Sequence, residues 1–397
     1  MPIPTPFHTR TAPLCESWEW RNWAGYLAPS LYEPTHEREY FAIRNSAALI
    51  DVSPLYKYSI TGPDALRLVD RIVTRDVSRC AVGQAIYTPW CDAAGKMLDD
   101  GVVARLGPHE FRITAAHPNL RWFQDAAEGL DAAARDVSQE LAALALQGPH
   151  SRAILKQLFT DVDWDRLGYF RLAQGALDGR PVSVTRTGYT GDLGYELWVA
   201  PALAEPLWDR IMAAGADYGL LPVGMAALDV ARIEAGLPLV EVDYISAYDA
   251  LLESQKSSPF ELGLRWAVAL DGGEFIGKAA LQAEKAARAR WAFIGLQVDW
   301  FELERLYNAV GLRPQVVGKR ASRSPVPLYS NGRQIGQATS HVFSPLLKRY
   351  LALATVEAAF AQPGACVEME MTVEYGRELA QATVALQPFF NPPRKRA

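Results

Sequence analysis

Short segments in which apolar and polar residues alternate recur along most of this chain of 397 residues. A period of two places every second side chain on one face of an extended strand, so these segments predict β-strands. Helical patterns lie between them, and two of these, 203–219 and 226–236, end at a glycine, as helices often do. The mixture predicts an α+β fold with a β-rich C-terminal third. The expected strands cover 55–62, 87–92, 102–106, 141–148, 182–188, 292–298 and 366–375.

Length and turn signals divide this pattern into parts. A chain of 397 residues exceeds one ordinary hydrophobic core, so two or three domains are expected. The sequence AAGK at 93–96 is typical of a turn between two strands, and Asn331-Gly332 is a strong signal for a two-residue hairpin. A charged, alanine-rich helix expected within 280–293 precedes the β-rich end. A domain boundary is therefore predicted there.

The charge of the chain argues against several kinds of partner. The formal net charge is −5, which gives no basis for electrostatic binding to nucleic acid or to an acidic membrane. The one basic run, Arg394–Arg396, is interpreted as a solvated tail. The sequence shows neither a signal-peptide pattern nor an apolar run near the ~18 residues of a membrane span. A cytoplasmic location is therefore expected.

Cysteine and histidine spacing gives no sign of a disulfide framework or of a metal site. The four cysteines contain no CxxC pair and are interpreted as reduced thiols. The six histidines show neither HxxH nor HExxH spacing, so no metal site is predicted, and they are interpreted as surface or capping residues. A serine hydrolase is also unsupported, because the chain lacks a GxSxG sequence.

Two adjacent carboxylates, Asp99 and Asp100, follow the AAGK turn. Neighbouring strand residues face opposite sides, so one carboxylate is expected to face solvent or the turn and the other the interior. An interior carboxylate can orient an amine nucleophile or stabilise a developing cation. The pair by itself favours a simpler interpretation, in which both are solvated acids at a hairpin.

The segment RTGYTGDLGYEL at 186–197 combines three glycines, two tyrosines and a glutamate. It is not a nucleotide phosphate loop, because it has no Lys-Ser/Thr pair or GxGxxG spacing, and a strand follows it. Glu196 could accept two parallel N–H bonds from an amidine-like edge such as that of a pterin. Tyr189 and Tyr195 could supply a flat wall. The alternative is an ordinary bulged hairpin with a satisfied glutamate, and the motif alone does not decide between them.

The same segment resembles the signature of the aminomethyltransferase (T-protein) family of the glycine cleavage system, a tetrahydrofolate-binding family. Further segments resemble that family in the same order along most of the chain, which is far more specific than any single motif. They are IRNSAALIDVS (43–53), AIYTPWCDAAGKMLDD (85–100), LALQGPHS (144–151), LDVARIEAGLPL (228–239), SPFELGLRWAV (258–268), FIGKAAL (275–281) and SHVFSPLLKRYLALA (340–354).

The resemblance implies a three-domain α+β fold around a central folate channel, with a barrel-like, β-rich C-terminal domain. The first two domains are expected to interleave along the chain, and the hairpin of Asp100 belongs to the second. The expected domains are 1–60 with 145–245 for the first, folate-binding domain, 61–144 with 246–290 for the second, and 291–397 for the third.

The resemblance also implies roles for particular residues. Asp100 matches the aspartate near the reactive folate nitrogens and is the predicted catalytic residue. Glu196 matches the glutamate that holds the pterin ring, which agrees with its interpretation as a bidentate acceptor. Further contacts are expected to the tetrahydrofolate cofactor from Tyr87, Tyr189, Thr114 and Phe170, and to the substrate from Leu228 and Trp23.

Several departures from the family pattern gather near these positions. Leu228 stands where glycine-cleaving members have arginine, Thr114 where they have asparagine, and Pro54 where they have histidine. Two connections, 240–257 and 299–315, are longer than is usual in the family. Because the changes cluster around residues with assigned roles, we expect an altered substrate rather than drift with unchanged function.

The sequence thus predicts a tetrahydrofolate-dependent one-carbon transferase. Its most favoured form is a demethylase that moves a methyl or methylene group from a small donor to N5 of tetrahydrofolate. One alternative is a glycine-cleavage aminomethyltransferase that uses a lipoylated carrier protein. Another is a folate-binding regulatory protein without transfer activity. Neither nucleic acid nor a membrane is an expected partner.

Overall fold

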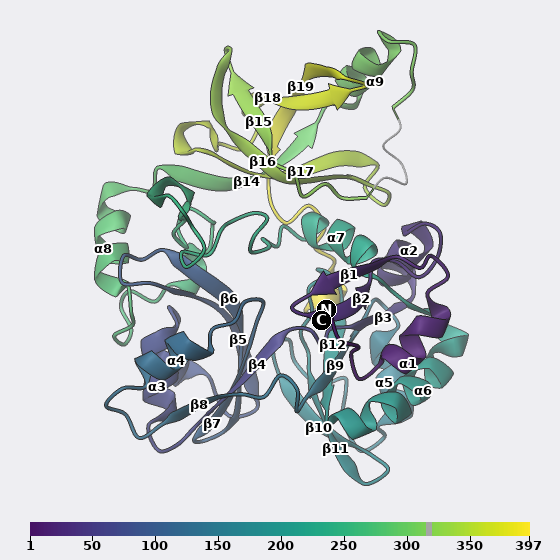
Figure 1. Ribbon diagram of the computed structural model, residues 1–397, viewed down its shortest axis with the longest axis vertical. Coiled ribbons are helices and arrows are strands. Elements are labelled where there is room, and N and C mark those ends of the chain that lie inside the picture. The colour runs from purple at the N-terminus through teal and green to yellow at the C-terminus, as the bar shows by residue number, and fades with distance from the viewer. Residues whose placement is uncertain (315–319) are drawn as a thin grey trace.

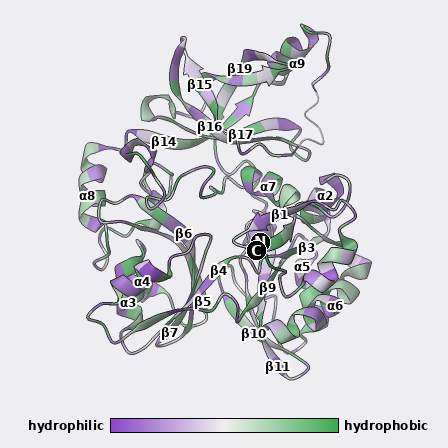
Figure 2. Cartoon of the chain, in the orientation of Figure 1, coloured by the Kyte–Doolittle hydropathy of each residue, from purple (hydrophilic) through white to green (hydrophobic). Residues whose placement is uncertain are grey.

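Three units built on β-sheets surround a common centre in the computed structural model, which describes residues 1–314 and 320–397 (Figure 1). Apolar residues recur along the strands of all three units (Figure 2). Within the described ranges, none of the helices combines the length and the apolar character that a bilayer crossing requires.

The first unit is a six-stranded sheet with helices on both faces (Figure 1). Its neighbouring strands run antiparallel except for the last pair, which is parallel. A small two-stranded ribbon, β1 (Trp20–Trp23) with β2 (Tyr26–Pro29), lies near it. In spatial order the six strands are β10 (Leu172–Leu177), β11 (Arg180–Thr185), β12 (Gly194–Val199), β9 (Ala142–Gln147), β3 (Ala47–Asp51) and β13 (Leu220–Pro222).

Alternate residues along β9 account for the two helical layers. Leu144 and Leu146 belong to one apolar core, and Ala143 and Ala145 belong to another on the opposite face. The period of two therefore assigns the large side chains to one layer and the small ones to the other. The leucine side is covered by α5 (Ser151–Leu158) and α6 (Ala204–Gly215), and the alanine side by α2 (Glu37–Asn45) and α7 (Met225–Glu234).

The second unit is a five-stranded antiparallel sheet. Two helices, α3 (Ala65–Ile72) and α4 (Leu120–Ala126), pack against one face. The opposite face, which includes Tyr87 and Thr114, borders the centre of the molecule. The AAGK turn joins two of its strands as expected. The strands are β5 (Gln84–Cys91), β6 (Met97–Gly107), β7 (Glu110–Ala115), β4 (Tyr56–Thr61) and β8 (Ala133–Asp136).

The sheets also suggest where the first two domains divide. The chain leaves the first sheet after Asp51 and enters the second at Tyr56, so all of β4 lies in the second unit. It returns to the first sheet at Ala142. We therefore propose boundaries within 52–55 and 137–141, in place of those expected after residues 60 and 144.

The third unit is a closed six-stranded barrel. It follows α8 (Lys278–Ala287), the charged helix expected in this region, and α9 (Trp300–Asn308) packs against its core. Asn331 and Gly332 have φ angles of 51° and 73°, which confirms the two-residue hairpin. Of the connection 299–315, residue 315 lies outside the described residues. The strands are β14 (Trp291–Val298), β17 (Arg349–Glu357), β16 (Arg333–Ser344), β15 (Val326–Ser330), β18 (Cys366–Val373) and β19 (Gly376–Ala385).

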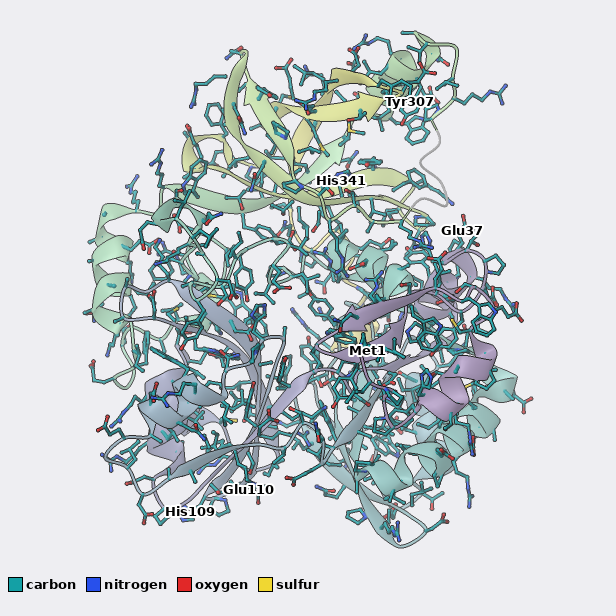
Figure 3. The ribbon with its side chains drawn as sticks, in the orientation of Figure 1. Met1, Glu37, His109, Glu110, Tyr307 and His341 are labelled. Carbon is teal, nitrogen blue, oxygen red and sulfur yellow. The ribbon has the colours of Figure 1, made fainter. Side chains whose placement is uncertain are left out.

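The histidines follow their expected roles in part. His109 is exposed at the tip of the hairpin between β6 and β7 (Figure 3), and His150 is exposed directly before α5. His36 directly precedes α2, but it is buried and, among the described residues, its side chain makes no capping hydrogen bond, so its expected role is wrong. His341 differs, because it lies in the barrel wall with its Nδ1 2.6 Å from the hydroxyl of Tyr350. Burial lowers the pKa of His341 to about 4. The interpretation of this histidine as a surface or capping residue is wrong.

The basic run at the C-terminus is not a solvated tail. The Arg394 guanidinium donates to both oxygens of the buried Asp192 carboxylate at 2.6 and 2.8 Å, and to the backbone oxygen of Arg44 at 3.0 Å. This bidentate contact attaches the C-terminal segment of the chain to the first unit. As a result, Lys395 and Arg396 border the central cavity.

Candidate active site

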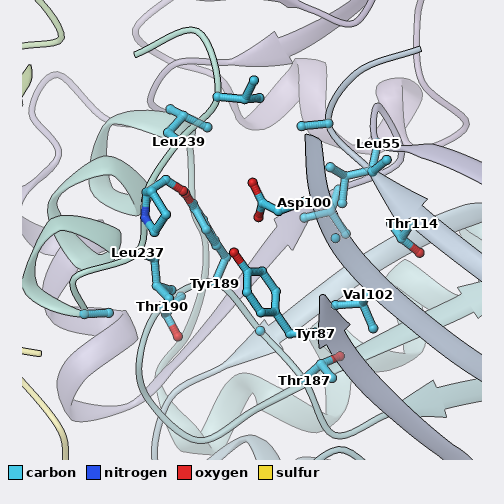
Figure 4. A pocket seen from close by; sticks show the side chains of 18 of the residues that line it. Leu55, Tyr87, Asp100, Val102, Thr114, Thr187, Tyr189, Thr190, Leu237 and Leu239 are labelled. Carbon is cyan, nitrogen blue, oxygen red and sulfur yellow. The ribbon is translucent and has the colours of Figure 1, made fainter. Parts of the chain in front are cut away.

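A cavity of about 1300 Å³ lies where the three units meet. The first unit contributes Gln147 and Glu196 to its wall, the second contributes Tyr87 and Asp100, and the third contributes Phe293. Figure 4 shows part of this wall. The central channel that the sequence resemblance implied is therefore present.

Asp100 projects from β6 into this cavity, with the hydroxyl of Tyr87 beside it (Figure 4). The Tyr244 hydroxyl donates a hydrogen bond to Oδ1 of the Asp100 carboxylate. Burial raises the pKa of Asp100, and the hydroxyls of Tyr244 and Tyr87 partly offset that rise. Asp100 is thus a carboxylate with oriented neighbours rather than a solvated acid.

Asp99 faces the opposite side of the strand, but it is fully buried. Its carboxylate accepts hydrogen bonds from the backbone N–H groups of Asp100 (2.8 Å) and His117 (2.9 Å) and from Nδ2 of Asn119 (2.9 Å). Burial raises its pKa, and the nearby charge of Asp100 adds to the rise. The interpretation of both aspartates as solvated acids is therefore wrong.

Glu196 borders the cavity from β12. Its Oε2 accepts a hydrogen bond from the Thr187 hydroxyl at 2.6 Å and a longer one from Thr185 at 3.5 Å. Burial raises the pKa of Glu196, while Thr187 and the charge of Arg112 act in the opposite direction. The Arg112 guanidinium reaches across from β7 and lies 4.2 Å from the ring centroid of Trp198. The glutamate is therefore supported from both sheets.

The expected aromatic wall is half correct. Tyr189 borders the cavity, and its hydroxyl donates to the backbone oxygen of Pro238 at 2.5 Å. Tyr195 is fully buried on the other face of β12, where its ring meets Trp164 edge-on at 5.8 Å between centroids. Since it is adjacent to Glu196 in the strand, it must point away from the cavity. Its expected place in the wall is wrong.

The glycines of RTGYTGDLGYEL leave space for the side chain of Gln147. A Cβ at Gly188 or Gly194 would lie 2.1 Å from Oε1 of Gln147. This buried amide accepts from Thr190 Oγ1 at 2.8 Å and donates to the backbone oxygen of Thr187 at 3.3 Å. The Gln147 amide therefore lies across the segment and is hydrogen-bonded to it, and this arrangement holds Glu196 and Tyr189 at the cavity.

The remaining expected contact residues also border the cavity: Thr114, Phe170, Leu228 and Trp23. Phe170 has a φ of 57° and links the two sheets, because its N–H donates to Arg186 O at 3.1 Å and its oxygen accepts from Ala85 N at 2.9 Å. The structure thus brings together every residue to which the family resemblance assigned a contact with cofactor or substrate, whereas Tyr195 lies outside the cavity.

Two arginines from distant segments gather beside Leu228. Arg323 contacts both oxygens of the Asp229 carboxylate at 2.7 to 3.1 Å, and Nη1 of Arg21 lies 3.5 Å from the same carboxylate. Asp229, Arg21 and Arg323 all border the cavity. Leu228 brings no guanidinium to this position, but Arg21 from β1 and Arg323 from the segment before β15 bring guanidinium groups to the cavity wall.

Several residues at or directly behind the cavity wall were not predicted. Trp266 stacks on Tyr87 with 5.7 Å between ring centroids, and Tyr244 contacts Asp100 from the connection 240–257. The unusual length of that connection was the one sequence signal that could have drawn attention to Tyr244. Trp266 lies in a segment that resembles the family, but nothing in its local pattern indicated contact with Tyr87.

His117 joins this connection to the end of β7. Its Nε2 lies 3.2 Å from Glu241 and its Nδ1 lies 3.4 Å from Asp249. One ligand atom from each of the three residues lies within 4.8 Å of the others. Since the two carboxylates face different ring nitrogens and are largely exposed, this geometry is typical of a polar side-chain bridge rather than of a metal site.

Comparisons with known proteins agree with this architecture. The GCVT N-terminal domain matches residues 9–272, and the glycine cleavage T-protein C-terminal barrel domain matches residues 308–391. An aminomethyltransferase of Moorella thermoacetica is 34% identical over 375 residues, covering 94% of this chain and 93% of that protein. A trimethylamine-oxide aldolase of Ruegeria pomeroyi is 35% identical over 405 residues, covering 99% of this chain and 47% of that protein.

The same fold is known from a solved structure. Glycine cleavage system aminomethyltransferase T from Bartonella henselae superposes with a TM-score of 0.83 at 22% identity, covering 98% of this chain and 99% of that one. The chain belongs to the glycine cleavage T-protein family. It is a one-carbon transferase of that family, as the resemblance in its sequence predicted.

Replacing Gly194 by alanine is expected to lower the free energy of unfolding by about 1–3 kcal/mol, because the new methyl group would overlap the Gln147 amide. Gly376→Ala is the matched control, since a Cβ there meets its nearest atom at 3.6 Å. Thermal denaturation of both variants measures the difference. Equal stability of the two variants would contradict the role given to Gln147.

Proposed function

We propose that this protein moves a methyl or methylene group from a small donor to N5 of tetrahydrofolate. The observation that most supports this is the presence of Asp100, Glu196 and Tyr189 on the wall of one cavity. These residues come from different sheets and segments, and each matches a residue of the T-protein pattern. A carboxylate for an amine, an acceptor for a pterin edge and an aromatic wall are the groups that such a transfer needs.

The surroundings of Glu196 fit a pterin. Thr187 and Thr185 donate to Oε2, and among residues 1–314 and 320–397 none donates to Oε1. Glu196 therefore keeps acceptor capacity for a ring N–H and an exocyclic amine. Tyr189 would pack beside the ring, and Thr114 and Phe170 would complete the pocket.

Asp100 would act at the reacting nitrogen. When bound, tetrahydrofolate supplies the N5 amine that takes up the one-carbon group. Asp100 would orient this amine, accept its proton, and stabilise positive charge that develops on nitrogen. Tyr87 would exclude water from this part of the cavity. Alignment of the two reactants in one cavity would lower the barrier by proximity.

The wall around Leu228 supports a small donor over a lipoylated carrier. Leu228 and Trp23 are apolar, while Arg21 and Arg323 border the same cavity and both contact the Asp229 carboxylate. The Ruegeria pomeroyi relative is named for trimethylamine oxide, a small methylated compound, which gives further support. The names of other relatives support the alternative, transfer of an aminomethyl group from a carrier protein.

Incubation with tetrahydrofolate and a panel of donors tests this choice. The panel contains a sulfonium, a quaternary amine, a tertiary amine and an aryl methyl ether, with an aminomethyl-lipoyl carrier protein in a separate arm. Because the small donors carry methyl groups and their transfer involves no oxidation, mass spectrometry is expected to find 5-methyl-tetrahydrofolate with a small donor. Ammonia and methylene product in the carrier arm alone would favour glycine cleavage. Folate binding without any product would favour a regulatory protein.

Replacing Asp100 by asparagine is expected to lower turnover about 10²- to 10³-fold, because the amide cannot accept the amine proton. The Kd for tetrahydrofolate should change little, since Glu196 provides the main pterin contact. Initial rates at saturating folate and fluorescence titration separate the two quantities. Full turnover in this variant would contradict the role of Asp100.

Replacing Glu196 by glutamine is expected to weaken tetrahydrofolate binding about 10- to 100-fold, as a charged acceptor contributes about 1.5–3 kcal/mol. Fluorescence titration measures the Kd. Glu378→Gln, an exposed change on the barrel strand β19, is the control. An unchanged Kd in the Glu196 variant would exclude the glutamate as the pterin contact.

A further inference from the structure

Tyr244 contacts Asp100 from outside the cavity. Its side chain is 3% exposed, and its hydroxyl donates to Oδ1 of the Asp100 carboxylate, whereas Asp100 itself borders the cavity. The carboxylate therefore has one oxygen held by the protein interior. Tyr244 belongs to the connection 240–257, whose length distinguishes this chain from the usual family pattern.

The backbone that holds Tyr244 is anchored through the preceding residue. Asp243 is fully buried, and four hydrogen-bond donors meet its carboxylate, so the position of Tyr244 is set by the first unit and the barrel together. The donors are Nη1 of Arg232 at 2.5 Å, the backbone N–H of Leu239 at 2.9 Å, Oγ1 of Thr339 at 2.6 Å and Oγ of Ser340 at 2.7 Å.

Tyr244 can act toward Asp100 only as a donor. Burial and then the charge of Asp100 raise the pKa of Tyr244 well above its ordinary value, so the hydroxyl keeps its proton at neutral pH. A hydroxyl that donates to a carboxylate stabilises the ionised form. The other titratable groups near Asp100 are Asp99 on the same strand, Tyr87 on β5, His117 after β7 and Tyr189 in the glycine-rich segment.

We propose that Tyr244 is a positioning residue for Asp100, which it holds ionised and oriented with its second oxygen toward the cavity. This inference rests on the proposed function only for the part that Asp100 plays in transfer. The long connection 240–257, which the family pattern does not define, would then supply the residue that orients the reacting carboxylate of Asp100.

A comparison of thermal stability at two pH values tests the contact without folate or donor. Tyr244→Phe removes one oxygen, and its hydrogen bond matters most where Asp100 is ionised. The loss in Tm relative to the unmodified protein is therefore expected to be about 2 °C larger at pH 8 than at pH 5. In an Asp100→Asn background the same change should cost an equal amount at both pH values.

A control and two adverse outcomes complete this test. Tyr248→Phe, on the same connection but 54% exposed, should show no pH-dependent loss. A loss in Tyr244→Phe that is independent of pH, or that persists unchanged in the Asp100→Asn background, would overturn the proposal. If Tyr244→Phe unfolds at pH 8, it should still fold at pH 5, where a smaller fraction of Asp100 is ionised, and failure to fold at both would also overturn it.

The pH profile of turnover tests the positioning role. Loss of the Tyr244 donor raises the pKa of Asp100 further, so a smaller fraction is ionised at low pH. In Tyr244→Phe the acid limb of kcat should move to higher pH, so that kcat falls more at pH 6 than at pH 9, while the KM for tetrahydrofolate stays the same. A uniform loss at all pH values would overturn the proposal. If the unmodified protein shows no turnover, that result contradicts the proposed function instead. The comparison of Tm values with and without Asp100→Asn would still test the contact between Tyr244 and Asp100.

Discussion

The arrangement of the cavity depends on a buried ion pair between Arg232 and Asp243. Both side chains are fully buried, and their closest nitrogen and oxygen atoms lie 2.5 Å apart. Such a pair is tolerated in the interior only where further hydrogen bonds satisfy it. Here those bonds come from Thr339 and Ser340 of the barrel, so one contact joins α7, the connection 240–257 and the third unit.

The position of the cavity at the seam of three units explains the chemistry of its wall. Helices pack on both faces of the first sheet and on one face of the second, and the barrel encloses its own core, while residues of all three units line the cavity between them. Carboxylates there are removed from water, which raises the pKa of both Asp100 and Glu196. Hydroxyl groups of Tyr244 and Thr187 offset this cost at the two carboxylates. The same elements therefore supply both the burial and the compensating hydrogen bonds.

Sequence reasoning succeeded where the signal was local and failed where it depended on distant partners. Alternation predicted strands such as β9, and Asn331-Gly332 predicted its hairpin, because a period or a turn involves neighbours in the chain. Asp99 was expected to be solvated, but it is buried, and two of the groups that donate hydrogen bonds to its carboxylate belong to His117 and Asn119, which lie further along the chain. The basic tail was misjudged because its partner, Asp192, lies about 200 positions earlier, as the contact of Arg394 with it shows.

The sequence by itself determined the α+β class, the family, and the identity of Asp100 and Glu196 as functional candidates, since these follow from periodicity and from ordered motifs. The tertiary structure decided what those carboxylates contact. Tyr244 reaches Asp100 from 144 positions away, and Arg21 and Arg323 meet at Asp229 from opposite ends of the chain. The physical reason is that burial and charge pairing depend on distances in space, which the spacing of residues along the chain does not specify.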